Sequence, residues 1–276
     1  MNNRQTSGLS LAINRTMVSF QKGSPLLERS VTPEFSIKIA NTLEERQAAF
    51  ALGYQVYLAK GFIRPNPHEM LIQSYDSNDE TVVLIVQDKE KNIAGSVTIV
   101  FDVNSRLPAE KIYREELKAL RNAGTKMAEL SRLVINPAYR NAKDILVLLF
   151  NYATIYIRQV KHYNSLSIQV NPRHKNYYKS ILNFDEVGAL KPCPQVQNAP
   201  AVLLYITEEK YQSEINLHGS SQNTDKQDRS LYQYFIKAEQ ENLVAYYLKK
   251  QAKPMNAEEK LHFGFTSSGI GQAVSA

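Results

Sequence analysis

The 276-residue chain has a single cysteine and no tryptophan. Cys193 lies in the segment KPCPQ, with no second thiol for an intrachain disulfide and no histidine at metal-ligand spacing. We therefore expect a reducing, cytoplasmic setting and no bound metal. Nothing nearby in the sequence would activate the thiol as a nucleophile, so Cys193 is interpreted as a turn residue between prolines.

Long apolar runs and blocks of basic residues are also missing. No segment has the length and apolar content of a signal peptide or a transmembrane helix, and no known motif or Lys/Arg block indicates a nucleic-acid partner. The chain is nonetheless basic, with 33 Lys and Arg against 27 Asp and Glu and a net charge of +6. This excess favours an acidic protein or another anionic partner.

The distribution of apolar residues predicts three parts. Residues 1–33 are rich in Ser, Asn, Thr and Arg and are expected to form a flexible polar arm. Residues 34–208 carry the main domain, and residues 209–276 form a helical C-terminal extension around an amphipathic helix at 231–250. We expect this helix to pack on the main domain through an apolar stripe that includes Tyr232, Ile236, Leu243 and Tyr247.

The main domain is predicted to be α+β (mixed α/β), with helices covering a central mixed sheet. Thr42, with Glu45 three residues later, is a plausible N-cap of the first helix, and the segment REELKALRNAG is interpreted as a polar connection. The strands on either side of helix 144–163 should be parallel neighbours, and an extended ligand can enter where such strands separate. Strands are expected at 35–40, 81–88, 93–102, 126–135, 165–170 and 201–206, and helices at 43–61, 144–163 and 174–182.

Four segments resemble the N-acyl amino acid synthase family, acyl-carrier-protein-dependent relatives of the acyl-homoserine-lactone synthases. They are RLPAEKIYREELKALR, AELSRLVI, VNPRHKNYYKSILNF and VQNAPAVLLYI, and the resemblance covers residues 35–206. It implies a fold like that of the Gcn5-related N-acetyltransferases, which would make 34–208 an acyltransferase domain. The implied reaction transfers a long acyl group from acyl carrier protein to the amino group of a free amino acid. No cofactor would be bound permanently, since acyl-phosphopantetheine arrives on the carrier protein.

The resemblance assigns roles to residues on strand 126–135. Glu129 and Arg132 lie three residues apart, so they face opposite sides of the sheet unless a bulge intervenes. The resemblance implies such a bulge, with Glu129 as the base and Arg132 as an orienting or carboxylate-binding cation; the alternative is a buried structural pair between the two. Ser131, with Leu133 and Val134, is predicted to bind substrate, and no G-x-S-x-G elbow marks Ser131 as a nucleophile.

The segment INPAYRNAKDILVLLF, which joins this strand to the next helix, has no glycine. Arg140 and Asn141, with main-chain N–H groups at the helix start, are predicted to hold one anionic group. A turn without glycine favours the single phosphate of a carrier-protein arm over the diphosphate of coenzyme A. The docking surface for an acidic carrier-protein helix is predicted to comprise Arg158, Lys161, Arg173, Lys175 and Lys179.

The segment NPRHKNYYKSILNF offers a histidine and two tyrosines. By resemblance Tyr178 is the acid that protonates the leaving thiolate, with packing as the alternative, and Tyr177 is a packing residue. His174, at a helix start that disfavours imidazolium, is expected to have a structural or carrier-contact role, with a role as base the alternative. Of the acidic pair that lactone synthases carry upstream, only Asp76 is present in this sequence, and Thr98 stands where those enzymes would have an arginine. These differences weaken the interpretation of the protein as a lactone synthase. The rival functions are a coenzyme-A-dependent N-acetyltransferase and a non-catalytic carrier-protein-binding protein.

Overall fold

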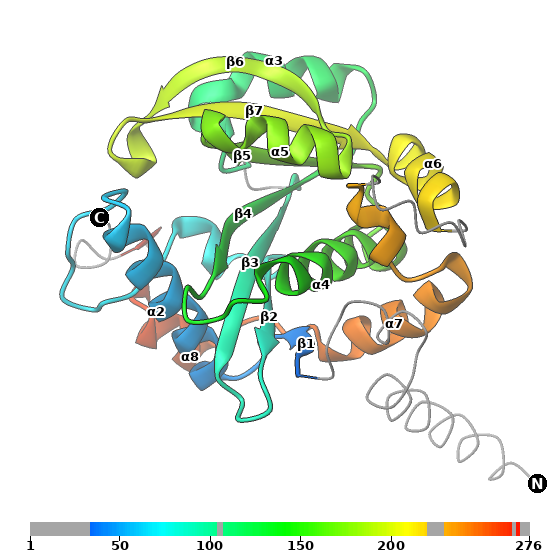
Figure 1. Ribbon diagram of the computed structural model, residues 1–276. Helices are drawn as coiled ribbons and strands as arrows, with labels where there is room; N and C mark the ends of the chain where they lie inside the picture. The colour runs from blue at the N-terminus through cyan, green and yellow to red at the C-terminus, as the bar shows by residue number, and fades with distance from the viewer. Residues whose placement is uncertain (1–33, 104–106, 220–228, 267–268, 271–276) are drawn as a thin grey trace, which may run out of the picture.

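The computed structural model describes residues 34–103, 107–219, 229–266 and 269–270, so the predicted arm at 1–33 lies outside the described residues. Its centre is a seven-stranded sheet in the order β1-β2-β3-β4-β5-β7-β6 (Figure 1). Neighbouring strands are antiparallel except β4 and β5, which are parallel as predicted. The strands are β1 (Ser36–Ile39), β2 (Val82–Gln87), β3 (Ile93–Phe101), β4 (Met127–Ile135), β5 (Ser165–Val170), β6 (Asp185–Cys193) and β7 (Ala199–Thr207), with a small pair β8 (Phe265–Thr266) and β9 (Gly269–Ile270).

Helices cover both faces of the sheet. The first, α2, begins as predicted, because the Thr42 side chain accepts a hydrogen bond from the Glu45 N–H. The α-helices are α2 (Leu43–Ala59), α3 (Glu110–Asn122), α4 (Ala142–Ile155), α5 (Pro172–Leu182), α6 (Glu208–Gly219), α7 (Ala238–Gln251) and α8 (Ala257–His262). Short helical turns are η1 (Ser74–Ser77), η2 (Tyr156–Val160), η3 (Pro194–Val196) and η4 (Leu231–Tyr234).

Successive side chains along the strands point to opposite faces of the sheet and pack in separate cores. On one face Ile99, Leu130 and Ile168 pack with α4, α5, η4 and α7 in the largest core. On the other face, residues of β2 pack with α2 and Phe263, and residues of β3, β4 and β7 pack with α3. Figure 1 shows the sheet between α4 and α5 on one side and α3 on the other. The arrangement is the mixed sheet flanked by helices that the sequence predicts.

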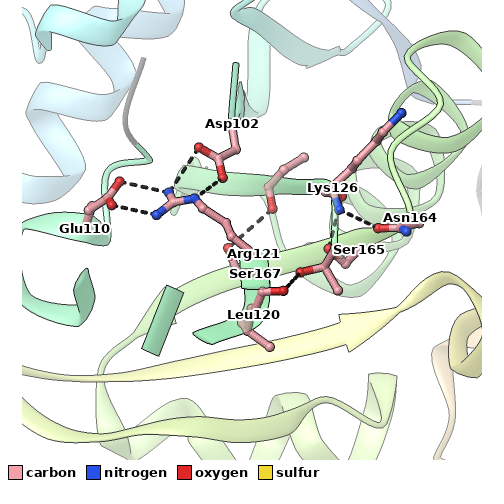
Figure 2. A network of polar contacts seen from close by, with 10 residues as sticks. Asp102, Glu110, Leu120, Arg121, Lys126, Asn164, Ser165 and Ser167 are labelled. Carbon is pink, nitrogen blue, oxygen red and sulfur yellow. Dashed lines mark hydrogen bonds and ion pairs between the residues drawn. The ribbon is translucent and has the colours of Figure 1, made fainter. Parts of the chain in front are cut away.

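The parallel pair β4 and β5 is joined at one end only. Pairing runs from Met127 with Ser165 to Leu130 with Ile168 and then stops. Side chains strengthen the joined end: the Lys126 N–H donates to Asn164 Oδ1 at 2.8 Å, and Ser165 Oγ donates to the Lys126 carbonyl at 3.1 Å (Figure 2). Beyond Leu130 the two strands separate, as expected of a sheet that admits an extended ligand.

Three elements differ from the sequence-based expectations. The segment interpreted as a polar connection is the helix α3, which buries Tyr113 and Leu117 on its sheet-facing side. The unpredicted strand β6 forms one edge of the sheet, where Pro192 is tolerated. It needs Gly188, since a Cβ there would lie 2.6 Å from the Tyr113 ring.

The predicted C-terminal helix at 231–250 is broken in the structure. The turn η4 and the helix α7 are separate, so Tyr232 and Ile236 are buried without belonging to α7. The buried residues of α7 are Glu241, Val244, Ala245 and Leu248. Several of these side chains join the largest core, so this part of the chain packs on the main sheet.

The turn η2 is tied to the C-terminal helices by Arg158. Its side chain is only 9% exposed and forms ion pairs with Glu208 at 3.2 Å and Glu241 at 3.3 Å. Nearby Lys161 is paired with Glu80.

In the described part of the chain, no helix is long and apolar enough to cross a membrane.

Candidate active site

Two cavities meet where β4 and β5 separate. The α3-side cavity, of about 140 Å³, is lined by Glu129, Ser131 and Cys193 among others. The α5-side cavity, of about 370 Å³, is lined by residues that include Leu133 and Val134. Both cavities share Tyr57, Phe62, Leu130, Arg132, Gln169, Val170 and Asn171. The opening in the sheet therefore lies between two hollows, one on each face.

A bulge in β4 stands at this junction. The pairing of β3 with β4 shifts between Ser96 and Thr98, and Arg132 has a left-handed φ of +50°. The shift gives β4 one extra residue, which brings Arg132 to the same side as Glu129 despite their spacing of three. Both residues line the α3-side cavity. The bulge implied by the family resemblance is present in the structure.

The Arg132 guanidinium is held by an ion pair with Asp76. Nη1 donates to Asp76 Oδ2 at 2.7 Å and to the Leu71 carbonyl at 2.7 Å, and Nη2 donates to Asp76 Oδ1 and to Thr98 Oγ1. The Asp76 side chain is completely buried and that of Arg132 is 7% exposed. The alternative considered from the sequence, a buried pair between Glu129 and Arg132, is therefore wrong, because Arg132 pairs with Asp76 instead.

Glu129 is a buried carboxyl group for which no ion pair is found among the described residues. It is 1% exposed, and its Oε2 accepts a hydrogen bond from the Ala109 N–H at 2.9 Å. Burial raises the pKa of Glu129 from the ordinary value of 4.5 to about 8; this hydrogen bond opposes the shift, and the charges of Glu110 and Asp102 add to it. A group with this pKa can exchange a proton near neutral pH.

Arg121 holds the two acidic neighbours of Glu129 in place. Its Nε donates to Asp102 Oδ2 at 2.5 Å, and its Nη1 donates to Glu110 Oε1 at 2.7 Å. Figure 2 shows the guanidinium between the two carboxylates. The clamp joins α3 to the end of β3, and thereby fixes the helix start whose N–H group contacts Glu129.

The remaining polar groups of the α3-side cavity form local pairs. Ser131 Oγ and the Tyr75 hydroxyl are 3.0 Å apart, which gives Ser131 the hydrogen-bonding role expected from the sequence. Cys193 was predicted to be a turn residue, but it ends β6, is 1% exposed and accepts a hydrogen bond from Gln169 Nε2 at 3.0 Å. No cluster of His, Cys, Asp or Glu within the described ranges could hold a metal ion.

Tyr178 lies in the wall of the α5-side cavity. Its ring packs on Phe150 with centroids 5.8 Å apart, and burial raises its pKa, with Tyr177 and Tyr57 adding to the shift. Tyr177, also in this wall, is 44% exposed. Tyr178 therefore keeps its proton at neutral pH, and both predicted roles, proton donor and packing residue, fit this position.

The mouth of the α5-side cavity is basic. Lys60, Lys143, Arg173 and His174 line it. Burial, followed by the charges of Arg173 and Lys60, lowers the pKa of His174, and its Nε2 accepts a hydrogen bond from Arg173 Nε at 3.0 Å. His174 is thus neutral, and Lys60 and Lys143 join Arg173 as cations at the mouth.

The other predicted anion-binding and docking residues are dispersed. Arg140 and Asn141 are exposed at the start of α4 and line neither cavity. Lys175 and Lys179 lie on α5 and face Glu186 at 3.0 and 3.9 Å. Arg158 does not lie on this surface, because its guanidinium forms ion pairs with Glu208 and Glu241. Lys161 is also distant from it, since it follows η2 beyond the C-terminal end of α4.

Comparisons with known proteins agree with this geometry. The model of the N-acyl amino acid synthase FeeM family matches residues 48–207. The solved structure of FeeM, an N-acyl amino acid synthase from uncultured soil microbes, is 25% identical with a TM-score of 0.56, over 67% of this chain and 95% of that one. The synthase LasI (18%, TM-score 0.48) aligns over 64% of this chain and 91% of its own. An acetyltransferase of the GNAT family from Streptococcus pneumoniae (17%, TM-score 0.44) aligns over 63% and 99%. No curated protein matches.

The fold, the opened sheet and the family match together define an acyltransferase. The chain belongs to the N-acyl amino acid synthase FeeM family, as the sequence resemblance predicted.

Several site residues were missed from the sequence. Tyr57 and Gln169 line both cavities, Tyr75 bonds Ser131, and Lys60 and Lys143 line the basic mouth. Tyr75 adjoins Asp76 in the segment QSYDSND, and this position could have marked it as a site residue. The others are distant in sequence from the motifs, so no local pattern marks them.

The raised pKa of Glu129 predicts a pH-dependent stability. Between pH 4.5 and 8 the native state keeps Glu129 protonated while the unfolded state ionises it, so the native state binds more protons and stability falls as pH rises. Relative to Glu129→Gln, the wild type should lose up to about 1.4 kcal/mol of unfolding free energy per pH unit. Urea titrations at pH 5, 6.5 and 8 measure this difference, and identical pH dependence of the two proteins would contradict it.

Proposed function

We propose that the protein transfers a long-chain acyl group from acyl carrier protein thioester to the amino group of a free amino acid. The observation that carries the proposal is the position of Glu129, a buried carboxyl with a pKa of about 8, in the α3-side cavity next to Leu130, which lines both cavities. Family membership supports an acyltransferase, and the burial and raised pKa of Glu129 support its proposed role as the base. The single unpaired cysteine favours the cytoplasm as its compartment.

The α5-side cavity is the proposed entrance of the acyl donor. Beyond Leu130 no described strand pairs with β4 on its β5 side, so its main-chain groups can bind the amides of an extended pantetheine arm. The loop before α4 is fastened by the Tyr139 hydroxyl, which donates to Asp88 at 2.6 Å. A fastened loop without glycine does not wrap a diphosphate closely, which favours carrier protein over coenzyme A.

The acyl chain would follow the apolar wall of the α3-side cavity. This wall is built by β5, β7 and the turn before β7, and includes Val170, Val196, Ala199, Pro200 and Ala201. The opposite wall carries the polar groups of Glu129, Ser131, Tyr75 and Gln73. The cavity therefore offers an apolar side for the chain and a polar side for the amine.

In the proposed mechanism Glu129 accepts a proton from the acceptor ammonium group, and the free amine attacks the thioester carbonyl carbon. Main-chain N–H groups of the bulged strand would stabilise the oxyanion. The carbon–sulfur bond then breaks, the pantetheine thiolate takes a proton from Tyr178, and the second proton of the attacking nitrogen is lost through solvent, from which Tyr178 is reprotonated. Arg132, neutralised by Asp76, acts as a positioning residue that fixes the bulge rather than as a free cation.

The proposal is tested with purified protein, dodecanoyl carrier protein and the twenty amino acids, with products identified by mass spectrometry. We expect an N-acyl amino acid, with kcat/KM rising with pH towards about 8 as Glu129 ionises. Glu129→Gln should lower turnover at least about tenfold and remove that rise. Equal activity with dodecanoyl coenzyme A would favour the coenzyme-A-dependent alternative, and no transfer from either donor would favour a non-catalytic protein.

Tyr178→Phe tests the proton donor. The change keeps the ring against Phe150 and removes only the proton, so single-turnover acyl transfer should slow by about tenfold, or about 1.4 kcal/mol of barrier. Thermal unfolding should change little. Tyr177→Phe, next along the same helix, is the matched control. If wild type and Tyr178→Phe transfer equally fast, Tyr178 is a packing residue.

Carrier-protein docking should depend on the basic mouth. Lys60→Glu with Arg173→Glu reverses two charges there, and should weaken binding of acyl carrier protein at least about tenfold. Wild-type binding should also weaken with salt, because exposed charges are screened over about 8 Å at physiological ionic strength. The control, Lys118→Glu with Lys249→Glu, makes the same charge change at exposed sites outside both cavities. Equal affinities in the two variants would exclude this docking surface.

A further inference from the structure

A third hollow adjoins the α3-side cavity on the face away from α5. This α3 groove, of about 560 Å³, is lined by the η1 segment, the start of α3 and Gln195. Gln73, Tyr75, Pro108 and Gln195 line both the groove and the α3-side cavity. The groove therefore opens beside the polar wall that carries Glu129.

The cations of the groove are not used inside the protein. Lys111 and Arg114 are exposed, one turn apart on α3, and within the described ranges neither forms an ion pair or a side-chain hydrogen bond. The acidic residue of the groove, Glu110, is bound to Arg121. The groove thus keeps two uncompensated positive charges.

The neighbouring cavity lacks a cation that is available to a substrate. Among its described lining residues the only positive charge is Arg132, and Asp76 already neutralises it. An amino acid whose amine approaches Glu129 carries its carboxylate two bonds away. A carboxylate in this position needs a cation or several donors close by.

We propose that Lys111 and Arg114 bind the carboxylate of the acceptor, and that the α3 groove is the acceptor's entrance. Lys111 and Arg114 line the groove on the first turns of α3, the helix whose start donates the Ala109 N–H to Glu129, and the groove adjoins the α3-side cavity at Gln73, Tyr75, Pro108 and Gln195. The inference rests on the proposed function and deepens it. Donor and acceptor then enter from opposite faces of the sheet.

The proposal predicts a selective defect in acceptor binding. Lys111→Glu and Arg114→Glu should each raise KM for the amino acid about tenfold, while KM for acyl carrier protein and for the amino acid methyl ester, which lacks the carboxylate charge, stays unchanged. Lys118→Glu is the matched control, since it makes the same charge change on the same helix outside the groove. An equal rise in KM for acid and ester, or no rise for either, overturns the proposal.

A binding measurement separates this inference from the proposed function. Equilibrium dialysis of the full chain against a carbon-14-labelled mixture of the twenty amino acids, without acyl donor, requires no turnover. Binding that Lys111→Glu and Arg114→Glu reduce about tenfold supports the groove even if no acyl product forms. Binding that is absent in the wild type, or equal in all variants, overturns the groove even where acyl transfer is observed.

Discussion

The left-handed backbone at Arg132 is the constraint on which the site depends. This conformation costs a non-glycine residue about 1 kcal/mol or more, and the buried bonds from Arg132 to Asp76, Thr98 and the Leu71 carbonyl hold it in place. The extra residue places Arg132 and Glu129 on one side of the sheet. Arg132 lies two residues beyond Leu130, the last residue of β4 that pairs with β5, so the bulge and the opening of the sheet occur together.

Two ion-paired arginines flank Glu129, which itself has no ion pair among the described residues. Asp76 balances Arg132, and Arg121 is bound by Asp102 and Glu110. Glu129 remains without a cation, and burial therefore raises its pKa into the neutral range. The surrounding ion pairs fix the geometry, and Glu129 is the carboxyl group of this neighbourhood suited to proton transfer.

The sequence predicts local features well and distant pairings poorly. The Thr42 cap, the parallel pair β4 and β5, and the bulge follow from short motifs and from family resemblance. The helix α3 was missed because its polar composition conceals the buried Tyr113 and Leu117. Arg158 was misplaced because its partners Glu208 and Glu241 lie 50 and 83 residues away, and no local pattern reports such contacts.

An opened sheet also provides two separate binding surfaces, whereas a single pocket would have to bind both charged substrates. In the proposed reaction a phosphopantetheine arm and an amino acid both carry negative charge, and both would bring a reactive end into a buried centre. With basic residues at the α5-side mouth and in the α3 groove, each charge can stay near solvent on its own face. Only the thioester and the amine then meet beside Glu129. Because the ammonium group of the proposed acceptor would lose its proton beside Glu129, a carboxyl group whose own charge is disfavoured by burial would be a base of matched strength.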